Sequence, residues 1–406
     1  MVDILAAPQQ SHTDRKADSG LRTLTLISVA HWVSHVHALV LPMLFPFLKA
    51  ALGVDYLQLG FALTVFAVVS ALTQAPTGYL VDHFGARKIL LIGMCLGGLS
   101  LILLALHLTY TLLVASAVLL GLANSVYHPA DYAILAAHMD EARMGRAFSI
   151  HTFAGYLGTA VTPAIVAGLT TWVGGAGALA VIGAIGILVA LSLLLFGVPE
   201  ASAKHQASGG GKPSQQSIIT PALIVLTIFF MLLGLSSAGI SSFGLVALMN
   251  GFGASFSTAN VALTAYLGAA AVGVLAGGFL ADHTRRHGQV AAVCFGINTA
   301  IVLLIALVAL PAALLMIAMT AAGFLGGVIA PSRDMLVRNA APAGAAGRAF
   351  GLVSTGFNFS GIVSPILFGW VMDQNLPHWV FGLSALFMVL TVALTPFTER
   401  RPDLES

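Results

Sequence analysis

Charge is scarce in this chain of 406 residues, since only 8% of them are Asp, Glu, Lys or Arg, whereas about 25% is usual in soluble proteins. With 58% hydrophobic residues and a mean hydropathy of +0.96, a soluble domain would lack the polar residues that cover a core. The net charge of +2 provides no basic footprint for nucleic acid. Two cysteines, Cys95 and Cys294, are too few for a disulfide framework. The composition therefore predicts a polytopic membrane protein.

Long apolar runs are abundant, and twelve of them approach the length of about 20 residues that a helix needs to cross the hydrocarbon core. Polar or turn-rich breaks separate these runs. The sequence therefore predicts an all-α membrane protein with twelve transmembrane helices. The expected spans are 22–49, 57–81, 89–108, 111–137, 147–171, 177–197, 220–249, 258–281, 289–309, 312–338, 348–372 and 379–398.

Basic residues indicate how these spans are oriented, because Lys and Arg concentrate in cytoplasmic loops. With the N-terminus placed in the cytoplasm, Lys49 is the one basic residue in an external loop, and Arg333 lies within a span. The other 15 of the 17 lie in cytoplasmic segments or at their edges. Both termini are therefore expected in the cytoplasm. The polar residues 1–21 are expected to form a tail rather than a cleavable signal peptide.

The two halves of the chain repeat each other. The motif Gly-Tyr-Leu-Val-Asp-His at 78–83 recurs in similar form at 278–283, and Gly-Arg-Ala-Phe at 145–148 recurs at 347–350. A stretch rich in Gly, Ser and Lys lies between the halves and is typical of a flexible linker. We therefore expect two pseudo-symmetric six-helix bundles. The expected segments are a cytoplasmic tail at 1–21, bundles at 22–197 and 220–398, a cytoplasmic linker at 198–219 and a cytoplasmic tail at 399–406.

The loop between the second and third spans carries a recognisable motif. Its sequence, Gly-Tyr-Leu-Val-Asp-His-Phe-Gly-Ala-Arg-Lys at 78–88, resembles the signature loop of the major facilitator superfamily. The twelve spans, arranged as two similar halves of six, also resemble the architecture of that family. The resemblance implies the major facilitator fold, in which two bundles rock about a substrate site near the membrane midplane.

The same resemblance implies a conformational latch in this loop. Asp82 would accept hydrogen bonds at the start of span eleven, where the helix dipole favours an anion, and would stabilise the outward-facing state. The alternative is a basic turn that only fixes the topology. The predicted latch residues are Gly78, Asp82, Gly85, Arg87 and Lys88.

A second resemblance concerns spans one and four. Ser-Val-Tyr-His-Pro at 125–129, together with His31, resembles the fosmidomycin-resistance branch of bacterial drug exporters. Two positions depart from that pattern, because Ala130 precedes the acidic residue Asp131 and His35 stands where an acid is expected. This resemblance implies a multi-pass protein of the bacterial inner (plasma) membrane that exports drugs.

Ionisable groups within spans are functional candidates because the bilayer makes them costly. His31 and His35 lie four residues apart on one face of a helix, and His128 and Asp131 lie three apart on another. If these four residues converge, they can take up and release protons near physiological pH, and we expect them to couple transport to protons. The alternatives are a structural histidine network and a zinc or nickel site. We expect neither a metal nor another cofactor.

Asp131 and Arg333 occupy equivalent positions in the two halves, 202 residues apart. We expect them to form an ion pair when the inner side of the transporter closes, since opposite charges attract strongly in a dry interior. The alternative is that Arg333 pairs with its neighbour Asp334 or reaches the membrane interface. The residues expected to line a substrate cavity are Tyr127, His151, Tyr156, Tyr266 and Asn358.

Together these features predict a secondary active transporter that works by alternating access. The leading hypothesis is proton-coupled efflux of small amphipathic or anionic drugs, and the alternative is proton-coupled import of an organic anion or a metal chelate. An enzyme is not expected, because the sequence contains no P-loop, nucleophile elbow or HExxH helix. The expected partners are a small-molecule substrate, protons and membrane lipid but no nucleic acid, and a monomer suffices.

Overall fold

The computed structural model describes residues 8–139, 141–197, 220–284, 286–342 and 346–397, and the regular structure in these ranges is helical. The predicted linker at 198–219 and the predicted tail at 399–406 lie outside the described residues. The long helices are α1 (Pro8–Met43), α3 (Tyr56–Phe84), α4 (Ala86–Leu106), α5 (Tyr110–His138), α6 (Glu141–Leu195), α7 (Pro221–Ala238), α9 (Phe256–His283), α10 (His287–Leu307), α11 (Ala312–Ala340), α12 (Ala346–Asp373) and α13 (His378–Leu394). Shorter pieces are α2 (Phe45–Leu52), η2 (Gly239–Phe243), α8 (Gly244–Phe252) and η3 (Thr395–Phe397).

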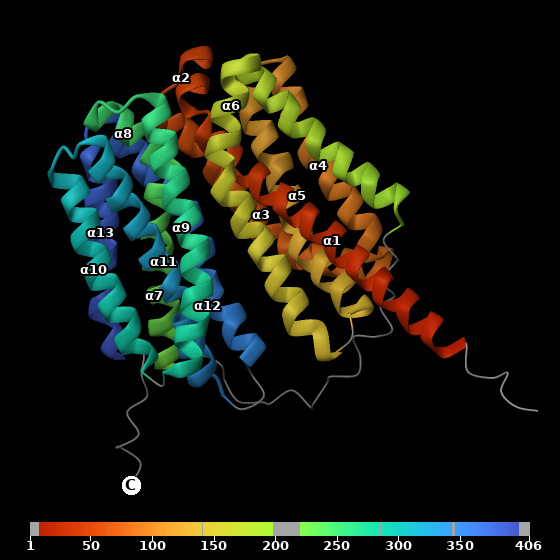
Figure 1. Ribbon diagram of the computed structural model, residues 1–406. Helices are drawn as coiled ribbons and strands as arrows, with labels where there is room; N and C mark the ends of the chain where they lie inside the picture. Colours follow the sequence, from red (N-terminus) through yellow and green to blue (C-terminus); the bar gives the residue numbers. More distant parts are fainter. Residues whose placement is uncertain (1–7, 140, 198–219, 285, 343–345, 398–406) are drawn as a thin grey trace, which may run out of the picture.

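Eleven stretches of the described residues are long and apolar enough to span a membrane, and one of them contains two spans. A straight helix of the 55 residues of α6 would be about 83 Å long at 1.5 Å per residue, far more than the membrane core. At Gly174 the chain adopts φ 72° and ψ 174°, a conformation that glycine tolerates and other residues avoid. There α6 reverses direction (Figure 1), so that spans five and six of the prediction both lie within it.

The helices form two bundles, one from α1 to α6 and one from α7 to α13 (Figure 1). Equivalent close contacts confirm that the halves share one packing scheme. A side chain at Gly121 would meet the carbonyl of Phe66, and one at Gly323 would meet the carbonyl of Tyr266. These two contacts lie 200 to 202 residues apart along the chain. The predicted all-α fold of two pseudo-symmetric six-helix bundles is confirmed.

At one end of the molecule, the upper end in Figure 1, the two bundles are joined, and we call this the closed end. The Asp373 carboxylate at the end of α12 accepts hydrogen bonds from the backbone N–H groups of Tyr56 (2.9 Å) and Leu57 (2.7 Å) at the start of α3. The amide of Asn250 donates to the Tyr56 hydroxyl at 3.0 Å. These bonds cross from one bundle to the other.

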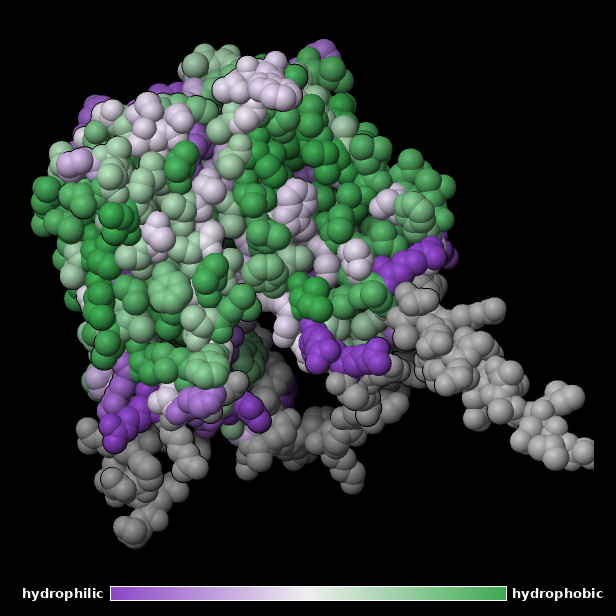
Figure 2. Space-filling model, viewed as in Figure 1, coloured by the Kyte–Doolittle hydropathy of each residue, from purple (hydrophilic) through white to green (hydrophobic). Residues whose placement is uncertain are grey.

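Toward the opposite end, which we call the open end, the bundles diverge (Figure 1) and a hollow separates them (Figure 2). Helices α3, α5 and α9 finish at this end, at Phe84, His138 and His283. Hydrophobic residues cover the flanks in Figure 2, whereas strongly hydrophilic residues gather near the open end. An apolar flank is what lipid requires of a membrane protein.

Span seven differs from the continuous helix expected over 220–249. It consists of α7, the π-helical turn η2 and α8. A π-turn inserts an extra residue into a helix and is frequent at functional sites. At this turn a side chain on Gly239 would collide with Phe368 and Ser384, and Ser241 lines the central cavity described below.

Candidate functional site

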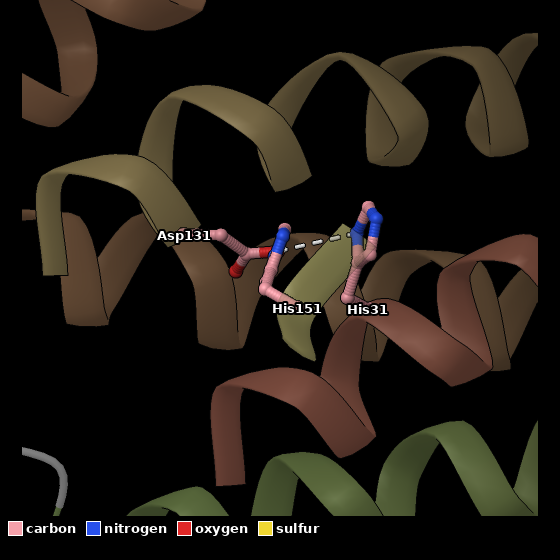
Figure 3. Close-up of side chains that lie close together, drawn as sticks. All are labelled: His31, Asp131 and His151. Atoms are coloured by element: carbon pink, nitrogen blue, oxygen red, sulfur yellow. Dashed lines mark hydrogen bonds and ion pairs between the residues drawn. The ribbon is translucent and has the colours of Figure 1, made fainter. Parts of the chain in front are cut away.

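Three buried polar side chains from different helices meet inside the first bundle (Figure 3). The Nε2 atom of His151 on α6 donates to Oδ2 of Asp131 on α5 at 3.0 Å. The Nδ1 atom of His31 on α1 lies 3.5 Å from the same oxygen. The exposed fractions of the three residues are 3% for His31 and 0% for the other two. One carboxylate therefore lies where three membrane-spanning segments meet.

Two further histidines extend this group along the His31 ring. The ring centroids of His31 and His35 are 4.7 Å apart, and those of His31 and His128 are 5.1 Å apart. His31 stacks on His151 with a centroid separation of 3.9 Å. We call these five residues, His31, His35, His128, Asp131 and His151, the His–Asp cluster. The structure brings together the four residues predicted for proton coupling and adds His151, which was predicted to line the cavity instead.

A small residue on α6 makes room for the His–Asp cluster. A side chain at Gly155 would lie 2.6 Å from Nε2 of His31 and 2.7 Å from Nε2 of His35. One turn later, the Thr159 hydroxyl lies 2.8 Å from Nδ1 of His35. Gly155 therefore permits α1 and α6 to approach closely enough for the imidazoles to stack, and Thr159 fixes the His35 ring.

The His–Asp cluster contains polar atoms that the protein does not fully satisfy. Oδ1 of Asp131 and Nδ1 of both His128 and His151 are buried without a hydrogen-bond partner among the described residues. A buried carboxylate is costly unless a positive charge or hydrogen bonds compensate it. Each imidazole can hold such a charge when it binds a proton. The arrangement can therefore hold a proton on an imidazole beside the Asp131 carboxylate.

The His–Asp cluster also has the composition of a metal site. Single ligand atoms of His31, Asp131 and His151 lie within 4.8 Å of one another, and imidazole and carboxylate are ligands that zinc accepts. Nε2 of His151 and Oδ2 of Asp131 already form a direct hydrogen bond without an ion. The metal site and the proton site thus remain alternatives with different tests.

In the second bundle, Arg333 of α11 brings a positive charge to the central cavity. Its Nε donates to Oδ1 of Asp334 at 2.9 Å. The guanidinium carbon lies 4.9 Å from the ring centroid of Phe230 and 5.1 Å from that of Phe357. In this conformation Arg333 pairs with Asp334 and Asp131 pairs with histidines, so the pair between Asp131 and Arg333 stays a prediction for a conformation closed at the open end.

A cavity of about 340 Å³ lies between the bundles. His35, Tyr156 and Thr159 line it from the first bundle, and Tyr266, Asn298 and Arg333 are among the residues that line it from the second. Its wall thus combines an imidazole that belongs to the His–Asp cluster with a guanidinium that belongs to the opposite bundle.

Of the five residues predicted to line the cavity, only Tyr156 and Tyr266 do so among the described residues. Tyr127 is buried within its own bundle, where its hydroxyl lies 3.5 Å from the Gly93 carbonyl. His151 is enclosed in the His–Asp cluster, and Asn358 is exposed. His151 and Asn358 lie on helices that do line the cavity, α6 and α12, whereas no described residue of α5, which carries Tyr127, lines it. The rotation of each helix about its axis decides which of its faces reaches the cavity.

The predicted latch residues lie at the open end. Asp82 and Lys88 are exposed, and a side chain at Gly78 would meet no atom within 4 Å. Gly85 adopts φ 97° between α3 and α4, and Arg87 donates through Nη2 to the Leu194 carbonyl at 3.0 Å. Gly85 and Arg87 therefore shape the turn, while the contact of Asp82 with span eleven stays a prediction for the outward-facing state.

Two residues with a clear structural role were not predicted. Asp373 joins the bundles at the closed end, and Asn298 presents a buried, unpartnered oxygen at the cavity. The carboxylate of Asp373 at the end of a span was visible in the sequence, but nothing there indicated its partner on α3. Asn298 was the one strongly polar side chain from residue 290 to residue 309.

The fold and the paired bundles define the class of the protein. The family model of the Major Facilitator Superfamily matches residues 27–244 and again residues 226–406. The chain therefore belongs to the Major Facilitator Superfamily and is a multi-pass secondary transporter rather than an enzyme.

Similar proteins narrow this class. The fosmidomycin resistance protein of Escherichia coli (strain K12) is 30% identical over 67% of this chain and 68% of that protein, which confirms the resemblance noted in the sequence. Multidrug resistance protein 1 of Bacillus subtilis (strain 168) is 24% identical over 92% of this chain and 95% of that protein. The structure of a bacterial homologue of the human lysosomal transporter Spinster, inward-facing and unoccupied, matches with a TM-score of 0.77 at 13% identity, covering 95% of this chain and 99% of that one.

Proposed function

We propose that this transporter exports small amphipathic or anionic molecules, including drugs, in exchange for protons. The observation that carries the proposal is the His–Asp cluster, a carboxylate in contact with two imidazoles inside a membrane-spanning bundle. Ionisable groups are kept in such a place where transport uses their charge. The names of two relatives, a fosmidomycin resistance protein and a multidrug resistance protein, favour export of drugs.

In the proposed mechanism His35 connects the substrate to the proton. Its ring lines the central cavity and contacts His31, which in turn lies 3.5 Å from Asp131. The apolar part of a substrate that enters the cavity displaces water from around His35. Loss of water disfavours the charged form of an imidazole and so promotes release of a proton from the His–Asp cluster. The groups that share this proton are His31 and His35 of α1, His128 and Asp131 of α5 and His151 of α6, with the Tyr132 ring beside them.

The proposal places the open end in the cytoplasm of a bacterial cell. Lys88 and Arg338 lie at that end, whereas Lys49 lies at the closed end beside the Tyr56 ring. This distribution follows the rule that basic residues favour the cytoplasmic side. The two termini are then cytoplasmic, and one chain with its two bundles, at 22–197 and 220–398, encloses the cavity without a second copy.

Closing the open end would bring the proposed gate residues together. We infer that Asp131 releases its histidines and pairs with Arg333, while Asp82 caps the start of α12. A variant in which Asp131 and Arg333 exchange identities is expected to regain transport relative to either single replacement, because the pair is kept with its charges reversed. If the exchange variant is no more active than the single variants, the proposed gate pair is wrong.

The direction and the driving ion are tested in inside-out membrane vesicles with an acidic lumen. Fosmidomycin, chosen from the name of a relative, is expected to accumulate in the lumen and to dissipate the pH gradient. Vesicles with the Asp131→Asn variant serve as the control for leakage. Accumulation only in right-side-out vesicles with acid outside would instead support the alternative, an importer of organic anions, which the guanidinium in the cavity favours.

A further inference from the structure

The guanidinium of Arg333 is held in place by groups that leave two of its nitrogens free. The rings of Phe230 and Phe357 flank it at 4.9 and 5.1 Å, and Nε is bonded to Asp334. In the described part of the chain neither terminal nitrogen has a protein acceptor. The side chain is 16% exposed and lines the central cavity. Arg333 is thus a preorganised planar donor with unused N–H groups.

The charge of the cavity favours an anion. Its described lining contains Arg333 and the titratable His35 but no carboxylate. Asp334 does not line the cavity, and its side chain is 48% exposed, so water shares in stabilising its charge and it compensates Arg333 only in part. A weakly hydrated guanidinium binds planar or tetrahedral anions through two parallel hydrogen bonds.

A second polar group of the same wall lacks a partner. Oδ1 of Asn298 on α10 is buried without a hydrogen bond, although the residue is only 1% exposed and lines the cavity. A buried carbonyl oxygen without a donor costs free energy. A ligand that carries a hydroxyl or N–H group would supply that donor.

We propose that the second bundle's side of the cavity is a binding site for a small organic acid that carries a hydrogen-bond donor. The acidic group binds the terminal nitrogens of Arg333, and the hydroxyl or N–H group binds Oδ1 of Asn298. The volume of about 340 Å³ is at the small end of ligand sites. This inference rests on the proposed function, because it assigns the substrate class of the same cavity. The bound anion occupies the guanidinium that Asp131 takes when the open end closes.

The test measures binding to the purified full-length transporter in lipid nanodiscs, with no pH gradient. The probes are 4-hydroxybutyrate and 3-hydroxypropylphosphonate, each compared with its uncharged counterpart, 4-hydroxybutyramide and the dimethyl phosphonate ester. At least one anion is expected to bind about tenfold or more tightly than its neutral counterpart, since hydrogen bonds to charged groups are the strong ones. Equal affinity, or no binding of either anion, would overturn the proposal.

Variants locate the site. Arg333→Gln is expected to remove the preference for the anion, and Arg333→Lys to retain part of it, because lysine keeps the charge but not the planar fork. Arg338→Gln, which removes an exposed positive charge from the same helix, is the matched control and is expected to leave the affinity unchanged. Melting curves with all variants exclude unfolding as the cause. An anion preference that survives Arg333→Gln would contradict the assignment.

The role of Asn298 is tested with a probe that lacks the donor. The parent protein is expected to bind 3-hydroxypropylphosphonate about fivefold more tightly than propylphosphonate. Asn298→Ala is expected to abolish this difference in affinity. An unchanged difference would remove Asn298 from the site. If the anionic probes bind no more tightly than their neutral counterparts while a pH gradient still drives efflux, this inference alone is overturned. Anion binding without gradient-driven transport would overturn the proposed function instead.

Discussion

The two bundles have the same packing but opposite chemistry. In the first bundle His31, His128 and His151 surround Asp131. The positions 202 residues later than those three histidines are occupied by Leu233, Ala330 and Val353, which lie within the helices of the second bundle. The position that matches Asp131 is Arg333.

This difference shows which of these residues the shared fold does not require. Because the second bundle folds with Leu, Ala and Val where the first has histidines, the histidines are not required by the packing scheme. A close helix contact also occurs at equivalent places in the two halves. In the first half Gly158 of α6 lies against Trp32 of α1. In the second half the glycine is on the other helix of the pair, because Gly234 of α7 lies against Ser360 of α12. Under the proposed mechanism the first bundle therefore carries a charge that changes with proton binding, and the second carries the fixed charge of Arg333.

The largest effect is expected when the carboxylate of the His–Asp cluster is neutralised. Asp131→Asn keeps the size of the side chain but removes the charge that His31 and His151 share. Drug resistance of cells is expected to fall about a hundredfold toward that of cells without the transporter, since a broken buried pair costs about 3 kcal/mol or more. Growth at graded drug concentrations measures this.

The matched control for that variant is Asp334→Asn in the second bundle. Its side chain is about half exposed and pairs with Arg333, and exposed ion pairs contribute little. Resistance is expected to change by less than about threefold, which corresponds to well under 1 kcal/mol. Equal losses in the two variants would contradict the contrast between the bundles.

A smaller effect is expected at the closed end, where the bundles meet. Asp373→Asn weakens two charge-assisted hydrogen bonds to the start of α3. It is expected to lower the population of molecules in which the closed end is shut about tenfold. Distances between spin labels on α2 and α8, in a variant without native cysteines, report the opening. Asp55→Asn is the control, because Asp55 caps the same helix from within its own bundle and Asn caps equally well. Unchanged distances in Asp373→Asn would show that this contact does not hold the state.

The smallest effect is expected at His37, a buried histidine of α1 outside the His–Asp cluster. Its Nε2 lies 3.3 Å from the Ile182 carbonyl. His37→Gln retains a donor for that carbonyl and is expected to leave proton-driven transport within about twofold, a change below about 0.5 kcal/mol. His35→Gln, measured in the same vesicles, is expected to impair coupling. A loss of coupling in His37→Gln would extend the proton site beyond the five residues.

Much of the architecture was predictable because a membrane restricts the choice of fold. Hydropathy, loop charge and the repeat of 200 to 202 residues each indicated twelve spans in two halves. The convergence of His31, His35, His128 and Asp131 was also predictable, since ionisable residues in spans face the bundle interior. The place of His151 in the cluster and the burial of Tyr127 were not predictable, because both depend on the rotation of a helix about its axis. Small residues such as Gly155 determine that rotation, and they do so only once the helices pack. The partner of Asp373 depends on the conformational state, which no local pattern contains.

One measurement tests the central claim most directly: drug transport into proteoliposomes, with and without a pH gradient, by a variant that carries the second bundle's residues in the first. This variant combines His31→Leu, His128→Ala and His151→Val with Asp131→Asn. Exchange of labelled for unlabelled drug without a gradient is expected to continue, whereas accumulation driven by the gradient is expected to disappear. Accumulation equal to that of the parent protein would contradict the account, because protons would then drive transport without the groups assigned to carry them.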